Sequence, residues 1–438
     1  MELLLSVLYV SVFLAIIFRW RFFNIQGVKR TWLAWAFVIK VIVGVGVGLL
    51  YTYHYKERNL ADTFKFFDDS RVMYNMFFMN KGYFFRMFTG YGDDATYLLP
   101  YYDLMNNWYN KVALFNDYRT QIRINCLMRF FSGGYYYVHS VMFSFLSFVG
   151  LTAMYRVFAE EIPQKKKILF AGVYFMPSVL FWGSGLLKDG LIFFATGCTL
   201  LFLYRLTSYR TKIFLYGFLF LACLIFLMTI KFHNYILLFP LLVAYGLTMV
   251  NPQKIFLKFS AITAMYFIAL INMDLILPHF GLMDLIAKKQ FEFLELNKMY
   301  SPGSEIALST LYPSVKSLIL NAPEAYYHSF FRPFFFESKS PLILFAGFEN
   351  LFLLLALVVS LMGYRKSDMR FSPILYLAVF YVLLLFLLIG LVVPVMGAMV
   401  RYKAQALPFL FFVLVMAFDY KMLMIRFPFL EKLLKARK

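Results

Sequence analysis

The sequence predicts an all-α membrane protein, a polytopic transmembrane helix bundle of about eleven spans with two extracytoplasmic helical inserts. Three observations predict this class. The chain of 438 residues is 62% hydrophobic and 15% charged, whereas soluble domains carry about 45–50% apolar and about 25% charged residues. Its apolar runs reach the roughly 17–25 residues that cross a bilayer core. Its basic residues gather in short clusters between these runs. A soluble enzyme is therefore excluded.

The expected spans follow one another along the chain. They lie near residues 2–18, 31–53, 135–158, 168–184, 190–204, 213–230, 235–249, 259–278, 341–364, 371–399 and 404–418. The first run is not a cleavable signal, because it lacks a basic start and a small-residue cleavage site and is followed by Arg19 and Arg21. It is expected to span the membrane with the N-terminus outside.

Charge sets the expected orientation. Alternate connections between the spans hold most of the Lys and Arg residues, and short cytoplasmic loops attract such residues. This pattern places the C-terminus in the cytoplasm and accounts for the net charge of +20 without a nucleic-acid partner. The segments 54–134 and 279–340 are nearly neutral, as outside loops should be.

These two long segments are predicted to be folded inserts in a single transmembrane domain that covers residues 1–438. They are rich in Phe, Tyr, Met and Leu, which argues against disorder. An amphipathic helix over 97–115 is expected to lie on the outer leaflet. Trp108, Tyr101, Tyr102 and Tyr109 would then form an interfacial aromatic belt or stack on sugar rings.

Adjacent carboxylates in the first insert are the candidate catalytic groups. Asp68 and Asp69 cannot point the same way on a helix, but one of them facing a cavity could act as a general base. The alternative is that they are solvated loop acids, or that Asp69 caps a helix.

A turn with the sequence SGLLKDG supplies the first candidate for substrate binding. Lys188 and Asp189 lie there between two short spans, which would hold them slightly below the lipid headgroups. An anionic ligand or their mutual pairing would offset the cost of these buried charges. The alternative is a self-neutralised lysine that reaches to the surface.

Further polar residues are expected on the same outer face. They are Lys231 and His233 after the sixth span, His328, Arg332 and Glu337 in the second insert, and Arg401, Tyr402 and Lys403 near the last span. The cations among them suit a phosphate or pyrophosphate, because Arg forks match phosphate oxygens and Lys supplies a point charge. The five histidines and three cysteines show no metal-ligand spacing, so no metal site, zinc site or disulfide framework is indicated.

These motifs resemble those of polytopic glycosyltransferases of the GT-C type and of related bacterial polysaccharide polymerases. The resemblance rests on DDSRVMY with Asp68 and Asp69, on SGLLKDG, and on a late RY-x-x-x-x-x-P helix start with Arg401 and Tyr402. It implies transfer of a sugar from a polyprenyl phosphate or diphosphate donor to a glycan or lipid acceptor, at the extracytoplasmic face of a bacterial inner membrane. Asp68 or Asp69 would deprotonate the acceptor, and Lys188, Arg332 and Arg401 would stabilise the departing phosphate. No cofactor is implied, and a divalent metal bridging carboxylates and diphosphate is compatible with this chemistry.

Two other functions remain open. A flippase or transporter of lipid-linked oligosaccharide would share the span pattern, although such proteins more often carry several ionisable groups at mid-membrane depth. A non-catalytic subunit of an envelope assembly would share it as well. The sequence leaves open the sugar, the acceptor, the stereochemistry and the oligomeric state.

Overall fold

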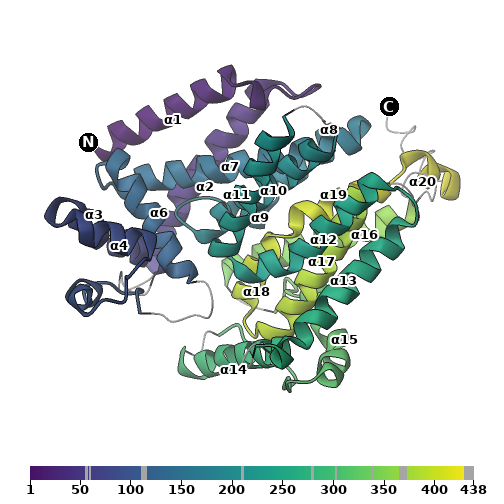
Figure 1. Ribbon diagram of the computed structural model, residues 1–438. Helices are drawn as coiled ribbons and strands as arrows, with labels where there is room; N and C mark the ends of the chain where they lie inside the picture. Colours follow the sequence, from purple (N-terminus) through teal and green to yellow (C-terminus); the bar gives the residue numbers. More distant parts are fainter. Residues whose placement is uncertain are drawn as a thin grey trace. The chain divides into compact units, whose positions relative to one another are not determined.

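The computed structural model describes residues 1–54, 58, 61–109, 116–208, 212–277, 281–300, 303–337, 340–364 and 372–428. Within these residues all regular elements are helices, and extended pairing is limited to three isolated bridges (Figure 1). Eight of the described helices are long and apolar enough to cross a membrane, or nine if one bent pair counts as a single span. The predicted class, an all-α polytopic bundle, is confirmed, with fewer spans than expected.

Prolines explain part of the difference in span number. The run 168–184 forms two short helices, because Pro177 cannot continue a helix and forces Met176 into an extended conformation. The run 371–399 ends as a helix at Val392, two residues before Pro394, and the next two helices meet at 64°. The seventeen-residue helix Ile255–Ile271 is apolar but shorter than the eight candidates.

The helices pack into two compact units. Unit 1 comprises Met1–Val157 and Leu180–Tyr235, and unit 2 comprises Phe158–Val179 and Ile236–Lys438. The elements of unit 1 are α1 (Glu2–Arg19), η1 (Arg21–Phe23), α2 (Arg30–His54), α3 (Asp62–Met79), α4 (Lys81–Thr89), η3 (Thr96–Leu98), α5 (Leu99–Tyr102), α6 (Asp117–Ser132), α7 (Tyr136–Glu161), α10 (Lys188–Ser208) and α11 (Ile213–Ile230). Those of unit 2 are η4 (Pro163–Lys165), α8 (Lys166–Phe175), α9 (Pro177–Trp182), α12 (Phe232–Val250), α13 (Ile255–Ile271), η5 (Met273–Leu275), α14 (Leu282–Tyr300), α15 (Val315–Phe331), α16 (Pro341–Met362), α17 (Pro373–Val392), α18 (Met396–Ala404), α19 (Leu407–Ala417) and α20 (Tyr420–Arg426). Helices α7, α9 and α12 run from one unit into the other.

Close helix contacts hold the spans of unit 1 together. Helices α10 and α11 pack side by side as a hairpin (Figure 1). Helix α7 crosses α10 where Gly150 faces Gly197, so closely that a Cβ on Gly197 would lie 1.9 Å from the Gly150 carbonyl oxygen. Small residues at such crossings let membrane helices approach closely.

The first insert (54–134) has a small core of its own. Helix α3 packs on α4 and α6, and the core includes Met73, Ile122 and the stacked rings of Tyr102 and Trp108, whose centroids are 4.5 Å apart. Tyr102 and Trp108 are almost fully buried, so neither the predicted aromatic belt nor sugar stacking fits them. The prediction of one helix over 97–115 is also wrong for residues 97–109, the part of this range that the structure describes. Helix α5 covers four residues there and turns follow it, while 110–115 lie outside the described residues.

The second insert (279–340) packs on the membrane helices of its own unit. Helices α14 and α15 both lie against α17. The buried side chain of Gln290 donates hydrogen bonds to the carbonyls of Ser309 (3.1 Å) and Leu391 (2.7 Å) and accepts one from the Leu311 amide (2.8 Å). These bonds fix the chain between α14 and α15 to the end of α17.

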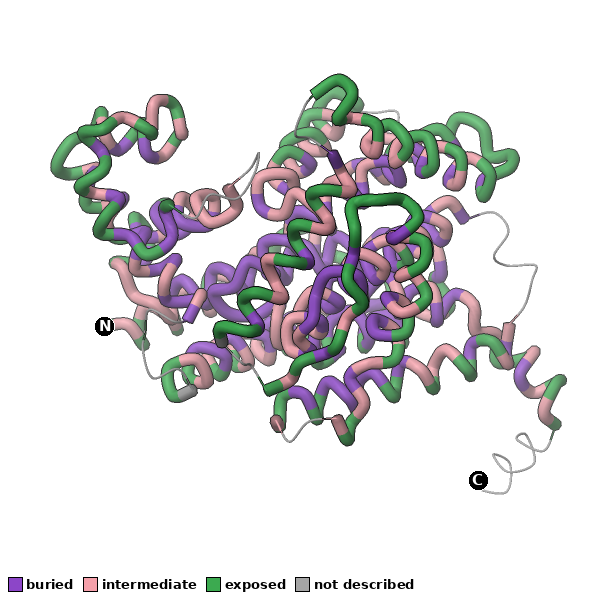
Figure 2. Tube along the Cα trace, turned by 90° about the horizontal axis from the view of Figure 1, so that it is seen from below, coloured by how far each residue is buried: buried purple, intermediate pink, exposed green. Residues whose placement is uncertain are grey.

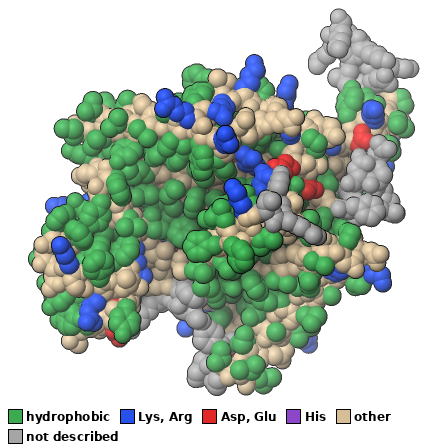
Figure 3. Space-filling model, turned by 45° about the horizontal axis from the view of Figure 1, so that its top comes forward, with side chains coloured by type: hydrophobic (Ala, Val, Ile, Leu, Met, Phe, Trp, Pro, Cys, Tyr) green, Lys and Arg blue, Asp and Glu red, His purple; other side chains and the backbone are tan. Residues whose placement is uncertain are grey.

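Several candidate spans expose their apolar surface. Only 6% of the apolar window of α1 and 17% of that of α11 is buried, against 83% for α7. Exposed and buried stretches alternate along many helices (Figure 2), and hydrophobic side chains predominate on the face shown in Figure 3. Such surfaces are stable against lipid, so the chain is a membrane protein.

Candidate functional site

The two adjacent carboxylates of α3 have different surroundings. Asp69 is fully buried, and its oxygens accept hydrogen bonds from the backbone amides of Asn106 (2.7 Å) and Asn107 (2.9 Å) and from the Asn106 side chain (2.9 Å). Burial raises the pKa of Asp69, and these bonds oppose part of that rise. Because fixed donors occupy this carboxylate, the geometry favours a structural role over the catalytic role predicted for Asp69.

Asp68 points to the exposed side of α3. It forms a two-point ion pair with Arg58, with N–O distances of 2.7 and 2.9 Å, and both side chains are at least 40% exposed. Exposed ion pairs contribute little free energy and exchange partners readily. The catalytic role of Asp68 stays a prediction.

Lys188 is the first residue of α10, and its side chain contacts one carboxylate and two aromatic rings. Its ammonium is 3.1 Å from the Asp117 carboxylate. The same nitrogen lies 3.7 Å from the ring centroid of Tyr118 and 4.6 Å from that of Phe66. Asn116 caps α6 by accepting hydrogen bonds from the amides of Tyr118 and Arg119, and this cap positions Asp117. An ion pair and two cation–π contacts therefore fix the ammonium group.

This geometry corrects the predicted Lys188–Asp189 turn. Helix α10 is 21 residues long and begins at Lys188 itself, so the two residues do not lie between two short spans. The partner of Lys188 is Asp117, which sequence reasoning missed. Asp189 is buried in the first turn of α10, where unpaired amides favour a carboxylate.

Two more charged groups act on Lys188 within unit 1. Lys231 follows the last turn of α11, and Asp62 begins α3; both lie close enough to affect Lys188 electrostatically. We call Asp62, Asp117, Lys188 and Lys231 the Lys188 cluster. Lys188 and Lys231 are thus near enough to influence each other, while their predicted role in binding a phosphate stays a prediction. His233 lies in the first turn of α12, two residues beyond Lys231.

The Lys188 cluster combines the two kinds of group that transfer of a phosphate-linked sugar requires. A carboxylate accepts the proton of an attacking hydroxyl, and an ammonium stabilises a departing phosphate. Asp117 could have been found from the sequence, because Asn-Asp before a helical run is typical of a helix start. No sequence pattern shows that the starts of α3, α6 and α10 lie together.

In unit 2, the predicted residues of the second insert neutralise one another. The Arg332 guanidinium lies 3.0 Å from Glu337, which also accepts a hydrogen bond from the Phe334 amide (2.8 Å). His328 lies 3.3 Å from Glu324, and burial lowers the pKa of His328. Arg332 and Glu337 therefore close a turn, a structural role that the prediction of substrate binding did not include.

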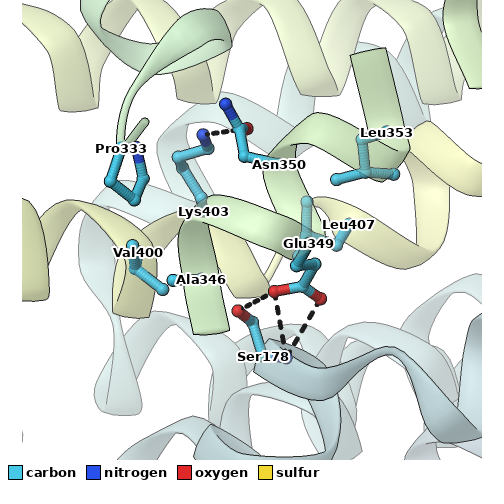
Figure 4. Close-up of a pocket in the computed structure, with 9 residues that line it drawn as sticks. All are labelled: Ser178, Pro333, Ala346, Glu349, Asn350, Leu353, Val400, Lys403 and Leu407. Carbon is cyan, nitrogen blue, oxygen red and sulfur yellow. Dashed lines mark hydrogen bonds between the residues drawn. The ribbon is translucent and has the colours of Figure 1, made fainter. Parts of the chain in front are cut away.

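A small pocket of about 10 Å³, room for about one water molecule, lies beside this turn in unit 2. Figure 4 shows Glu349 of α16 pointing to Ser178 and Lys403 of α18 pointing to Asn350. Glu349 accepts hydrogen bonds from the Ser178 amide (3.0 and 3.2 Å) and from the Ser178 hydroxyl. Lys403 donates to the Arg332 carbonyl (2.9 Å) and to Asn350 Oδ1 (3.1 Å). Both charged groups thus have neutral partners: Glu349 is bonded to Ser178 at the start of α9, and Lys403 is bonded to the Arg332 carbonyl at the end of α15 and to Asn350 of α16.

The predicted phosphate clamp is only partly assembled. Arg332 and Lys403 are in contact, but through the backbone carbonyl of Arg332. Arg401 and Tyr402 are half-buried and lie near the end of helix α18, not at a helix start as predicted. The cations of unit 2 and the aspartates of unit 1 belong to different units, so their meeting in one cavity stays a prediction.

A second polar network in unit 1 was not predicted. The ring of His139 is hydrogen-bonded to Ser132 (Nε2 to Oγ, 2.7 Å) and to Asn125 (Nδ1 to Oδ1, 3.0 Å). The order resembles a nucleophile, base and orienting residue. All three side chains are fully buried, however, and the Asn125 amide is held by the Gln121 carbonyl (2.9 Å). The network therefore joins α6 to α7.

In the part of the chain that the structure describes, no three His, Cys, Asp or Glu side chains are grouped to hold a metal ion. The fold and the apolar helices define a polytopic α-helical membrane protein. No family model matches the chain, and neither the curated proteins nor the solved structures contain a match to it.

Proposed function

We propose that this chain is a membrane glycosyltransferase or polysaccharide polymerase that uses a polyprenyl phosphate- or diphosphate-linked sugar. The observation that carries the proposal is the Lys188 cluster. The Lys188–Asp117 ion pair, at 3.1 Å, lies near a second lysine and a second aspartate. The two lysines lie at the ends of the candidate spans α10 and α11, and the two aspartates lie at the starts of the insert helices α3 and α6. An anionic lipid headgroup is the ligand that such a cluster suits best.

The proposed reaction breaks one ion pair and uses both partners. The donor phosphate takes the place of Asp117 beside Lys188, with Lys231 as a second cation. Asp117 then accepts the proton of an acceptor hydroxyl, whose oxygen attacks the anomeric carbon. The bond between that carbon and the phosphate oxygen breaks, and the lipid phosphate leaves with its electron pair, stabilised by the two ammonium groups. Asp62 or Asp68 is the alternative base.

The proposed setting follows from the charge distribution. If the basic connections face the cytoplasm of a bacterium, the N-terminus lies outside the inner membrane and the C-terminus lies in the cytoplasm. The Lys188 cluster then lies on the extracytoplasmic side. The lipid-linked donor enters from the bilayer, and the acceptor is a glycan or a lipid.

The test is transfer of a labelled sugar from a polyprenyl-linked donor to an acceptor by the purified full-length chain. Asp117→Asn and Lys188→Met should each lower the transfer rate by about 10²–10³-fold. Asp94→Asn is the matched control, since Asp94 is an exposed aspartate of the same insert. Melting temperatures measured in parallel separate a loss of chemistry from a loss of folding. Full activity of folded Asp117→Asn and Lys188→Met variants would contradict the proposal.

The pocket of unit 2 favours a second candidate function. Glu349 is buried in the candidate span α16, and Lys403 is buried in the bent helix pair α18–α19. Ionisable groups at such positions are typical of transport pathways. A flippase of lipid-linked oligosaccharide would move labelled donor across a sealed vesicle without forming a glycosidic bond. A subunit of an envelope assembly would show neither activity and would co-purify with a stable partner.

A further inference from the structure

The α10–α11 hairpin brings together two cysteines that lie 25 residues apart in the sequence. Cys198 and Cys223 lie on the packed α10–α11 hairpin, and their thiols are close enough to interact electrostatically. One turn nearer the open end of the hairpin, the rings of Phe194 and Phe226 meet with their centroids 6.1 Å apart. The two pairs share one antiparallel register, so the thiols face each other because of helix packing and not because of one side-chain rotamer.

The two sulfurs differ in accessibility. Cys198 is 5% exposed and lies on the buried face of α10. Cys223 is partly exposed on α11, most of whose apolar window is open to the surroundings. A small reagent dissolved in the lipid can therefore reach Cys223, whereas Cys198 is reached through Cys223.

We propose that Cys198 and Cys223 are a dithiol site that closes to an intramolecular disulfide. The packed hairpin and the neighbouring Phe194–Phe226 contact bring the two side chains to the same level of α10 and α11, and side-chain rotations would bring the sulfurs to bonding distance. Dioxygen dissolved in the bilayer is the oxidant. Two S–H bonds break, one S–S bond forms, and dioxygen takes up the two electrons and two protons to become hydrogen peroxide. The thiolate is disfavoured in lipid, so a redox catalyst is expected to speed the reaction.

The disulfide would restrain the hairpin that carries two members of the Lys188 cluster. Cys198 lies ten residues after Lys188, about 15 Å along α10, and Cys223 lies eight residues before Lys231, about 12 Å along α11. Oxidation therefore joins the two helices at similar distances from both lysines. This inference does not depend on the proposed transferase activity.

The experiment uses the full-length wild-type chain in detergent micelles, oxidised in air with copper–phenanthroline. Maleimide labelling after denaturation counts the remaining thiols, and proteolysis with mass spectrometry identifies linked peptides. We expect two of the three thiols to disappear, a peptide linking Cys198 to Cys223 within one chain, and full recovery with dithiothreitol. Retention of all three thiols, links between chains, or a link to the buried Cys126 would overturn the proposal.

Two variants provide the matched controls. Cys126→Ser should form the same link at the wild-type rate. The double variant Cys223→Ser, Ile225→Cys moves the thiol to a side chain that is 56% exposed and points to another side of α11. Its link to Cys198 should form at least tenfold more slowly than in the wild type. Equal rates in the wild type and this variant would mean that helix mobility, and not the alignment of Cys198 with Cys223, explains the reaction, and would overturn the proposal.

Discussion

Replacing Asp69 by alanine tests whether this buried carboxylate is a structural group. The substitution leaves three donors, the amides of Asn106 and Asn107 and the Asn106 side chain, without their acceptor. An unsatisfied buried donor costs about 1–3 kcal/mol, so the lower end of that range gives a loss of about 3 kcal/mol. For a unit of this size each kcal/mol lowers the melting temperature by roughly 2–4 °C. A decrease of roughly 6–12 °C is therefore expected in a thermal melt of the detergent-solubilised chain.

The neighbouring residue is the matched control. Asp68→Ala removes an ion pair whose partners are 40% and 53% exposed, and such pairs contribute about 0–1 kcal/mol. Limited proteolysis should show faster cleavage after α5 in Asp69→Ala than in Asp68→Ala. If Asp69→Ala melts like the wild type and has lost sugar transfer, Asp69 is catalytic and the structural assignment is wrong.

Three further predictions concern charge and packing. Burial raises the pKa of Asp69 in the folded chain, so the stabilising contribution of the Asp69 carboxyl is full below its unfolded pKa of about 3.9 and is lost as pH rises through the folded pKa. Melting curves from pH 4 upward should therefore show the wild type losing stability relative to Asp69→Asn. A difference in melting temperature that does not change with pH would contradict this sign. Gly197→Ala should lower the melting temperature strongly, because the new Cβ would collide with the backbone of Gly150. Gly217→Ala should leave the melting temperature unchanged or raise it slightly, because no atom lies within 4 Å of the new Cβ. Similar melting temperatures of the two variants would refute the close crossing of α7 and α10. Lys403→Met removes a buried ammonium group together with its two hydrogen bonds, and it should lower the free energy of unfolding by about 2–4 kcal/mol in a denaturant titration. A more stable variant would show that the cost of burying the charge is larger than the stabilisation by its hydrogen bonds.

Composition and the periodicity of apolar runs determined the class of this protein. Membrane helices satisfy their own backbone hydrogen bonds, so an apolar run of sufficient length predicts a helix without knowledge of its neighbours. Helices α1, α2 and α11 accordingly begin and end within a few residues of the predicted spans. The ends of other spans were predicted less well, because Pro177 divides one predicted span into two short helices and another ends as a helix at Val392, two residues before Pro394.

Proximity between segments that are far apart in the sequence was decided by the tertiary structure. The sequence identified Lys188 and Lys231 as candidates but not Asp117, which lies 71 residues before Lys188 in the sequence and contacts it from the start of α6. It identified Asp68 or Asp69 as a candidate base, although only the folding of the turn after α5 determines that three donors occupy the Asp69 carboxylate. It gave no reason to pair Cys198 with Cys223, since the register of the α10–α11 hairpin depends on side-chain packing between helices. The identity of a helix is a local property of the chain, whereas the partners of its polar groups depend on contacts that no local pattern encodes.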